Sequence, residues 1–213
     1  MSQAVGFVDV GYLKAEGART LGYRHGDSFV DAPGCVAVLR ELAGQEGATL
    51  LRAYWYDGAF EPNDPRFVGQ RRYLDAVASC PGIQLRLGHL RTHTPKWHVP
   101  IQAALEACGV DMTEFKKHYT FRDEVEQKGV DSLIVLDLVR LAQRHAYDTA
   151  FLLAGDRDLA EAVRVAQDEG RRVVILRPQQ DEGVAAELRH LADEVYQLTT
   201  AQLQSMVQTR VKR

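Results

Sequence analysis

The sequence predicts an α/β fold with a central, mainly parallel sheet, and three observations carry that prediction. Short apolar runs alternate with longer segments of helical periodicity, the pattern of a parallel sheet wrapped by helices. Hydrophobic residues make up 46% of the 213 residues and charged residues 26%, so the chain can bury a sizeable core. No repeat, linker or low-complexity stretch divides the sequence. We therefore expect a single domain over residues 1–213.

The first half of the chain predicts three strands and two helices, bounded by glycine and proline. A long glycine-rich connection is expected after the first strand, and Pro81-Gly82 ends the second helix. In order, we expect a strand at 4–10, a helix at 34–46, a strand at 48–56, a helix at 66–79 and a strand at 83–90. Residues 91–127 are too long for an ordinary connection, so they are predicted to be an insertion with some structure of its own.

The second half returns to regular alternation. In order, we expect a helix from 131 to about 145, a strand at 149–153, a helix at 157–169, a strand at 173–177, a helix at about 185–191, a strand at 194–198 and a helical C-terminal tail at about 200–213.

Charge and cysteine content restrict the class of protein. The net charge of -3 gives no overall attraction to nucleic acid, so any phosphate-binding surface must be local. The three cysteines are scattered without a CxxC pair, which favours reduced thiols over a disulfide framework or a zinc module. The N-terminus lacks the features of a signal peptide, and no 18-residue apolar run occurs. We therefore expect a cytoplasmic protein without a membrane segment.

Four aspartates fall where a parallel sheet places its ligands, beyond the carboxyl ends of its strands. Asp9 ends the first strand, Asp131 opens a helix, and Asp156 and Asp158 follow the strand at 149–153. Helix capping alone can explain the last three, because Asp is a favoured N-cap and complements the helix dipole. It does not explain Asp9, which enters a sheet edge and requires a cation or several hydrogen-bond donors. Clustered carboxylates favour a hard divalent cation, since oxygen atoms are its preferred ligands.

Asp137 raises a separate question, because it lies in a helix that is apolar almost all round. Six residues of helix separate it from Asp131, about 9 Å along the axis, so both cannot easily reach one ion. We expect Asp137 to be a hydrogen-bonded residue behind the metal ligands rather than a ligand itself.

At this point the sequence resembles the NYN domain, a branch of the PIN-like nucleases that includes bacterial LabA-like proteins. The resemblance covers most of residues 4–198 and is weakest at 91–127. Its most specific feature is KGVD, then a buried helix, then GDxD at a helix start. The segments that carry it are FVDVGYL, KGVDSLIVLDLVRLA, YDTAFLLAGDRDLAEAVRVAQDEGRRVVIL and ELRHLADEVYQL.

The resemblance implies a PIN-like three-layer α/β/α fold and a ribonuclease that depends on Mg²⁺ or Mn²⁺. Carried over by position, the catalytic and metal-binding acids are Asp9, Asp131, Asp156 and Asp158. Two positions depart from the family pattern. Tyr12 replaces the Asn that often stands three residues after the first Asp, and Ala154 replaces the usual Ser before GD.

The chemistry is consistent with this interpretation. Phosphodiester hydrolysis requires an activated water and neutralisation of the charge that develops on the phosphate, and one or two Mg²⁺ ions supply both. No covalent nucleophile is needed.

Candidate substrate contacts surround the predicted acidic site. Lys128 lies three residues before Asp131, and Arg157 lies between the GDxD acids; with Tyr12 they form the inner set. The insertion adds Lys96 and Trp97 among other basic and aromatic residues, a composition that suits single-stranded RNA or an RNA loop. A solvated loop with inward-packed aromatics explains the same composition.

We therefore expect a metal-dependent ribonuclease, acting as an endonuclease on single-stranded or loop RNA. The alternative is an RNA-binding or regulatory module with a weak or inactive nuclease site, which Tyr12 keeps open. A phosphohydrolase of the haloacid dehalogenase type is less favoured, because its second acid would stand where Gly11 does. The sequence leaves a homodimer open.

Overall fold

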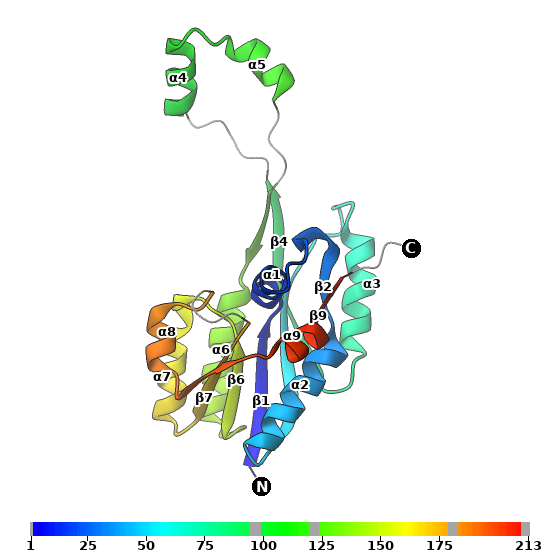
Figure 1. The fold of residues 1–213 in the computed structure, drawn as a ribbon, viewed down its shortest axis with the longest axis vertical. Coiled ribbons are helices and arrows are strands. Elements are labelled where there is room, and N and C mark those ends of the chain that lie inside the picture. Colours follow the sequence, from blue (N-terminus) through cyan, green and yellow to red (C-terminus); the bar gives the residue numbers. More distant parts are fainter. Residues whose placement is uncertain (1, 94–98, 120–123, 179–182, 210–213) are drawn as a thin grey trace.

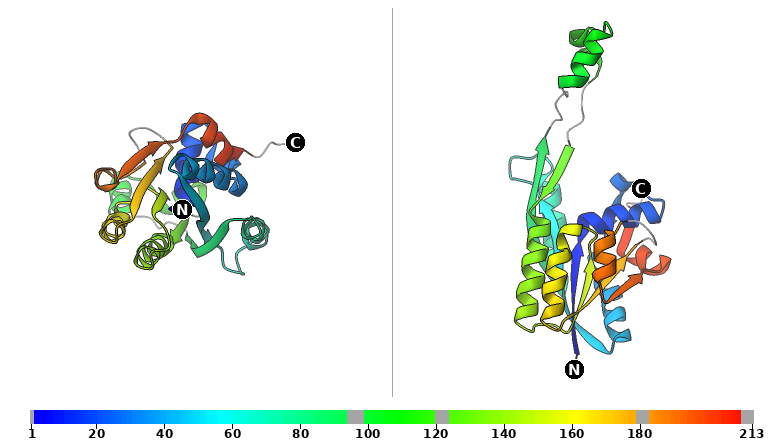
Figure 2. Two further views of the ribbon diagram at one scale, coloured as in Figure 1. Left: turned by 90° about the horizontal axis from the view of Figure 1, so that it is seen from below. Right: turned by 90° about the vertical axis from the view of Figure 1, so that its left-hand side faces the viewer.

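A computed structural model describes residues 2–93, 99–119, 124–178 and 183–209. These residues form three layers, in which helices cover both faces of a mostly parallel sheet (Figures 1 and 2). The predicted three-layer α/β/α fold is therefore confirmed. No helix in these ranges is long and apolar enough to cross a membrane.

Seven strands form the central sheet in the order β5-β4-β3-β1-β6-β7-β8, and two more form a small separate sheet, β2-β9. Every neighbouring pair in the large sheet is parallel except β4 and β5. The described strands are β1 (Ser2–Asp9), β2 (Ser28–Val30), β3 (Ala48–Ala59), β4 (Ile83–His93), β5 (Glu124–Lys128), β6 (Thr149–Leu153), β7 (Arg172–Arg177), β8 (Glu194–Gln197) and β9 (Val207–Thr209).

The helices divide between the two faces of the sheet, with one pair apart. Helices α1, α2, α3 and α9 contribute to the core on one face, and α6, α7 and α8 to the core on the other. The described helices are α1 (Val10–Thr20), α2 (Ala32–Gln45), α3 (Phe67–Ala78), α4 (Val99–Ala107), α5 (Met112–His118), α6 (Val130–Gln143), α7 (Ala160–Asp168), α8 (Ala186–Leu191) and α9 (Thr200–Met206), with short 3₁₀ turns η1 (His25–Asp27) and η2 (Arg157–Leu159).

Aromatic rings anchor the core under α6 and α7. Phe7 of β1 stacks on Tyr54 and Tyr56 of β3, with ring centroids 5.7 and 6.5 Å apart, and Tyr147 meets Phe7 edge-on. Side chains alternate between the faces of a strand, so Asp9, two residues after Phe7, belongs to this face. Asp57, directly after Tyr56, belongs to the other.

Two parts of the structure differ from the sequence-based expectation. The connection after the first strand contains a helix, α1, and the strand β2, where we expected neither. The predicted helical tail at 200–213 is wrong beyond Met206, because Val207–Thr209 form β9, which pairs antiparallel with β2. Residues 210–213 lie outside the described ranges.

The predicted insertion at 91–127 is built on a hairpin of two strands. Strand β4 continues to His93 and pairs antiparallel with β5, so the sheet extends into both ends of the expected insertion. Helices α4 and α5 lie beyond the ends of these strands, away from the main body (Figure 1). Lys96 and Trp97, two of the predicted RNA contacts, lie outside the described residues.

Candidate metal centre

The sheet topology brings the predicted acids to one edge. Strand β1 lies between β3 and β6, and the chain builds the sheet outward in opposite directions from these two neighbours. In open parallel sheets, ligands bind where the strand order reverses in this way, at the carboxyl ends of the strands. Asp9 ends β1, and Asp156 follows β6. Helix α6 precedes β6 and returns along it, so its first turn, with Asp131, lies at the same edge.

Asp9 is the most buried of these acids, with only 8% of its surface exposed. Its Oδ1 atom caps α1 by accepting a hydrogen bond from the Tyr12 backbone N–H at 3.1 Å. The pKa of Asp9 is raised to about 6, mainly by burial; the Tyr12 and Gly11 amides act against this rise, and the negative charges of Asp131 and Asp156 add to it. The side chain is thus held rigidly in a position where its charge is poorly compensated.

Asp131, Asp156 and Asp158 are more accessible to solvent and form the outer part of the cluster. Partial burial raises the pKa of Asp131, and the charges of Asp156 and Asp158 raise it further. Asp156 caps the turn η2, with its Oδ1 accepting from the Asp158 N–H at 2.9 Å. Capping and clustering therefore occur together, and Asp9, Asp131, Asp156 and Asp158 form one electrostatically coupled group.

Gly155 fixes the position of Asp156 through close backbone packing. A Cβ atom at Gly155 would lie 1.8 Å from the carbonyl oxygen of Gly183 and 2.7 Å from the ring of Tyr12. The Ala185 N–H also donates to the Gly155 carbonyl at 2.9 Å. The glycine before Asp156 is therefore required because the segment at 183–185 and the Tyr12 ring pack directly against it.

We expect Gly155→Ala to destabilise the protein by about 1–3 kcal/mol, the usual cost of inserting a methyl group into a tightly packed site. Displacement of Asp156 should also weaken any protection that Mn²⁺ gives against thermal unfolding. Differential scanning fluorimetry with and without Mn²⁺ measures both effects. Gly44→Ala serves as the control, because a Cβ at Gly44 meets no described heavy atom within 4 Å; equal behaviour of the two variants would contradict the packing argument.

Tyr12 lies between the acids and the core rather than toward solvent. Its hydroxyl oxygen is buried and has no hydrogen-bond partner among the described residues. Burial raises the pKa of the phenol, and the charges of Glu16 and Asp9 raise it further. Tyr12 therefore packs against Gly155, and its contact with substrate stays a prediction.

Asp57 belongs to the same edge and was missed by the sequence analysis. It lies near the end of β3, next to β1, and its Oδ1 accepts from the Gly58 N–H at 2.8 Å. The pKa of Asp57 is raised to about 6, mainly by burial; the Gly58 amide lowers it, the charge of Asp9 adds to the rise, and Lys14 lowers it. The rule that identified Asp9 applies equally here, because the Asp ends the apolar run AYWY.

Asp137 is engaged in a buried ion pair away from the cluster. Its Oδ2 accepts from Nε of Arg86 at 2.9 Å and from the Tyr56 hydroxyl at 3.2 Å. Asp137 is therefore hydrogen-bonded to side chains of β3 and β4, and its place behind the metal ligands stays a prediction.

The two predicted basic contacts that the structure describes are exposed and paired with glutamates. Nζ of Lys128 lies 3.1 Å from Glu126, and Nε of Arg157 lies 3.7 Å from Glu187 of α8. Exposed pairs of this kind contribute little to stability, so both side chains can exchange their partners for phosphate oxygens at small cost.

The donor set fits a hard divalent cation in chemistry and in charge. Carboxylate oxygens are the preferred ligands of Mg²⁺ and Mn²⁺. The charges of the neighbouring acids raise the pKa of Asp9 and of Asp131, where a cation would stabilise the ionised forms. However, no three His, Cys, Asp or Glu side chains within the described ranges converge closely enough to hold a metal ion in their present conformations. The acids are thus electrostatically coupled without forming a closed ligand cage.

The fold and the acidic residues at the carboxyl edge of the sheet define a class of protein. It is a three-layer α/β/α protein with an acidic site at the switch point of its sheet. The chain belongs to the NYN domain family, which it matches over residues 29–199, and that family is part of the PIN-like nuclease superfamily. Members generally use divalent metals. The match begins after β1 and α1, so the assignment of Asp9 and Tyr12 depends on their position in the structure.

One curated protein is also similar to part of the chain. The uncharacterized protein y4oD of Sinorhizobium fredii (strain NBRC 101917 / NGR234) is 45% identical over 67 residues. The alignment covers 31% of this chain and 31% of that protein.

Proposed function

We propose that this protein is a metal-dependent ribonuclease that hydrolyses phosphodiester bonds within single-stranded or loop RNA. Asp9, Asp131, Asp156 and Asp158 bind Mg²⁺ or Mn²⁺, and Lys128 and Arg157 contact the RNA backbone. The observation that carries this proposal is the coupling of four carboxylates at the switch point of a PIN-like fold. Metal bound there supplies the charge neutralisation and water activation that phosphodiester hydrolysis requires.

The protein's own residues contribute position and charge. Asp9 is fixed by its cap to Tyr12 N–H, and Asp156 by its cap to Asp158 N–H, so both carboxylates are held without support from substrate. The exposed side of the cluster, at Asp131 and Asp158, faces the solvent from which RNA approaches. This arrangement supports a site that is rigid at its base and open at its rim.

The experiment compares the wild-type chain with Asp156→Asn on labelled single-stranded RNA, hairpin RNA and DNA. Cleavage should require Mg²⁺ or Mn²⁺, disappear with EDTA, and fall at least about 100-fold in the variant, because several kcal/mol of charge stabilisation depend on the ion. Asp75→Asn is the matched control: Asp75 is an exposed carboxylate paired with Arg71 on α3. Metal-independent cleavage, or equal loss in both variants, would contradict the proposal.

A second candidate is an RNA-binding module that does not cleave. Two observations favour this candidate. The described acids do not form a closed ligand group, and Tyr12 replaces the Asn of the family. Tight RNA binding without cleavage in any metal would support this candidate. A phosphohydrolase of the haloacid dehalogenase type, by contrast, conflicts with membership of the NYN family. Release of phosphate from small phosphomonoesters would support that activity instead.

We further infer one domain over residues 1–213 and a cytoplasmic location. Cys35, Cys80 and Cys108 are all free thiols, which supports a reducing compartment. A homodimer stays a prediction from the sequence and forms no part of this mechanism.

A further inference from the structure

A large cavity adjoins the acidic cluster on the face of the sheet covered by α1 and α3. Its volume is about 740 Å³, within the range of about 300–1,000 Å³ that is usual for small-molecule sites. Helix α1 contributes Gly11 and Lys14, β3 contributes Asp57, and α3 contributes Gly69, Gln70 and Tyr73. Together with β2 and the β4–β5 hairpin, five separate parts of the fold therefore border one space beside the proposed metal site.

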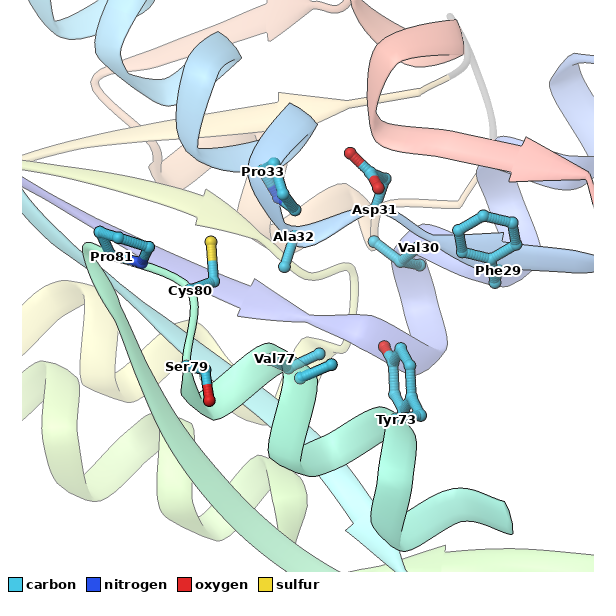
Figure 3. A pocket seen from close by; sticks show the side chains of 11 residues that line it. Phe29, Val30, Asp31, Ala32, Pro33, Tyr73, Val77, Ser79, Cys80 and Pro81 are labelled. Atoms are coloured by element: carbon cyan, nitrogen blue, oxygen red, sulfur yellow. The ribbon is translucent and has the colours of Figure 1, made fainter.

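Aromatic side chains form part of the lining of this cavity. Phe29 of β2, Phe60 after β3 and Tyr73 of α3 all line it. Phe29 and Tyr73 also line a second, mainly apolar hollow of about 330 Å³, in which β2 and α3 face each other (Figure 3). The two hollows thus share a wall, which extends the apolar surface along α3.

The polar groups of the cavity are few and differ in charge. Lys14 provides a cation within electrostatic range of Asp57, whose pKa it lowers. Gln70 is held in place, because its Oε1 accepts from the Phe60 N–H at 2.8 Å and its Nε2 donates to the Gly58 carbonyl at 2.7 Å. The guanidinium of Arg66 lies 4.1 Å above the Phe60 ring. The aromatic wall is therefore braced by hydrogen bonds and by a cation–π contact.

Gly11 and Gln127 lie where the cavity borders the acidic cluster. A Cβ at Gly11 would lie 3.3 Å from Oδ1 of Asp9 and 3.5 Å from the amide group of Gln127. Both Gly11 and Gln127 line the cavity. Asp9 therefore lies directly beside the lining of this cavity, close enough for a nucleotide next to a phosphate at the acidic cluster to reach it.

We infer that this cavity binds one nucleotide of single-stranded RNA, the neighbour of the scissile phosphate, and this inference rests on the proposed function. The base lies against the Phe60 and Tyr73 side of the cavity, and the phosphate lies at Lys14. Asp57 faces hydroxyl or amino donors of the sugar or base, since a carboxylate accepts hydrogen bonds and repels phosphate.

The aromatic and basic side chains that line the cavity favour an unpaired nucleotide over a double helix. Aromatic faces stack on unpaired bases of any sequence, and a lysine holds phosphate as a point charge. A double helix cannot enter, because its bases are stacked and paired and cannot reach a cavity of this size. The cavity therefore favours unpaired nucleotides and gives a physical reason for preferring single strands and loops.

The test fills the cavity from Gly69 and measures binding apart from cleavage. A Cβ at Gly69 meets no described heavy atom within 4 Å, and replacing a helix glycine does not weaken the helix. Gly69→Trp and Lys14→Gln are each made in the full-length Asp156→Asn chain. Fluorescence polarisation with a labelled single-stranded RNA of about 12 nucleotides, within the usual site sizes, gives the affinity. Gly44→Trp, on the exposed surface of α2, is the matched control.

We expect Gly69→Trp to weaken binding at least about 10-fold, the effect of losing one stacked base. Lys14→Gln should reduce the salt dependence of the affinity by about 0.7, the value for one phosphate contact on a single strand. Gly44→Trp should bind as the parent does. Unchanged affinity and salt dependence in both cavity variants would overturn the inference.

The same substitutions are also made without Asp156→Asn, and RNA cleavage by these variants separates the nucleotide-site proposal from the nuclease proposal. If the wild type cleaves and Gly69→Trp raises KM, both proposals are supported. If the wild type cleaves and the cavity variants leave binding and KM unchanged, the nucleotide site is wrong and the nuclease stands. If no cleavage occurs but Gly69→Trp still weakens RNA binding, the nucleotide site stands and the nuclease is wrong.

Discussion

Replacing Asp9 with Asn is expected to lower metal-dependent RNA cleavage about 1,000-fold while stabilising the metal-free protein at neutral pH. The loss follows from the position of Asp9 at the base of the acidic cluster, because losing about 4 kcal/mol of metal-dependent charge stabilisation corresponds to this factor. The gain in stability follows from the burial of the Asp9 side chain, because an ionised carboxylate is costly to bury. Asn retains the cap on Tyr12 N–H, since Asn and Asp are equally good N-caps, but it carries no charge.

The pH dependence gives the sign and size of the stability change. The pKa of Asp9 is about 6 in the folded protein, against an ordinary value of 3.8. A raised pKa means that the folded state binds the proton more tightly, so the stabilising contribution is complete below about pH 4 and is lost as the pH rises through 6. At pH 7 the ionised carboxylate thus costs about 3 kcal/mol relative to low pH, and Asp9→Asn removes that cost.

Urea unfolding of both proteins at pH 4, 5.5 and 7, in EDTA, measures this difference. The stability advantage of Asp9→Asn should grow with pH. Mn²⁺ added at pH 7 in place of EDTA should raise the stability of the wild type alone, because the ion binds the folded state. Asp9→Ala is the matched control, since it also removes the charge but loses the helix cap, at a cost of about 1 kcal/mol. An Asn variant less stable than wild type at pH 7 would show that Asp9 is compensated by groups other than a metal.

Sequence patterns predicted the central sheet well because its strands are short and apolar and are separated by clear breaks. The strand at 149–153 has the predicted bounds, and the edge that gathers Asp9, Asp131 and Asp156 follows from the parallel topology alone. Asp57 was missed although it obeys the same rule, because the aromatic strand was predicted to end at Tyr56, whereas β3 continues to Ala59. The signal was present in the sequence.

Other features depend on contacts between distant parts of the chain. Helix α1 carries Gly11 and Gly17, which argue locally against a helix. Gly17 is required because Val207 and Leu203 of the C-terminal segment pack against it, at 2.7 and 3.3 Å from where a Cβ would lie. The pairing of β2 with β9 joins residues near opposite ends of the sequence. Local periodicity contains no information about such contacts, so the connection and the tail were both assigned wrongly.

Replacing Arg86 with Leu is expected to destabilise the protein by about 3 kcal/mol. This substitution leaves Asp137, which is 5% exposed, as a buried carboxylate with the Tyr56 hydroxyl as its remaining side-chain partner among the described residues. Removing one partner of a buried ion pair typically costs about 3–5 kcal/mol, and the partial exposure of Arg86, 31%, places this pair at the lower end. Thermal and urea unfolding at pH 7 measure the loss.

Two further variants test whether the buried charge causes that loss. Tyr56→Phe removes a hydrogen bond but no charge, so it should cost about 1 kcal/mol. Arg86→Leu combined with Asp137→Leu removes both charges, and its stability should return close to that of the wild type, because an apolar pair often replaces a buried ion pair without loss. The double variant should also cleave RNA with unchanged kcat, since Asp137 pairs with the sheet rather than with the metal ligands. A double variant that is stable but has lost kcat would instead place Asp137 behind Asp131 as a positioning residue for the metal.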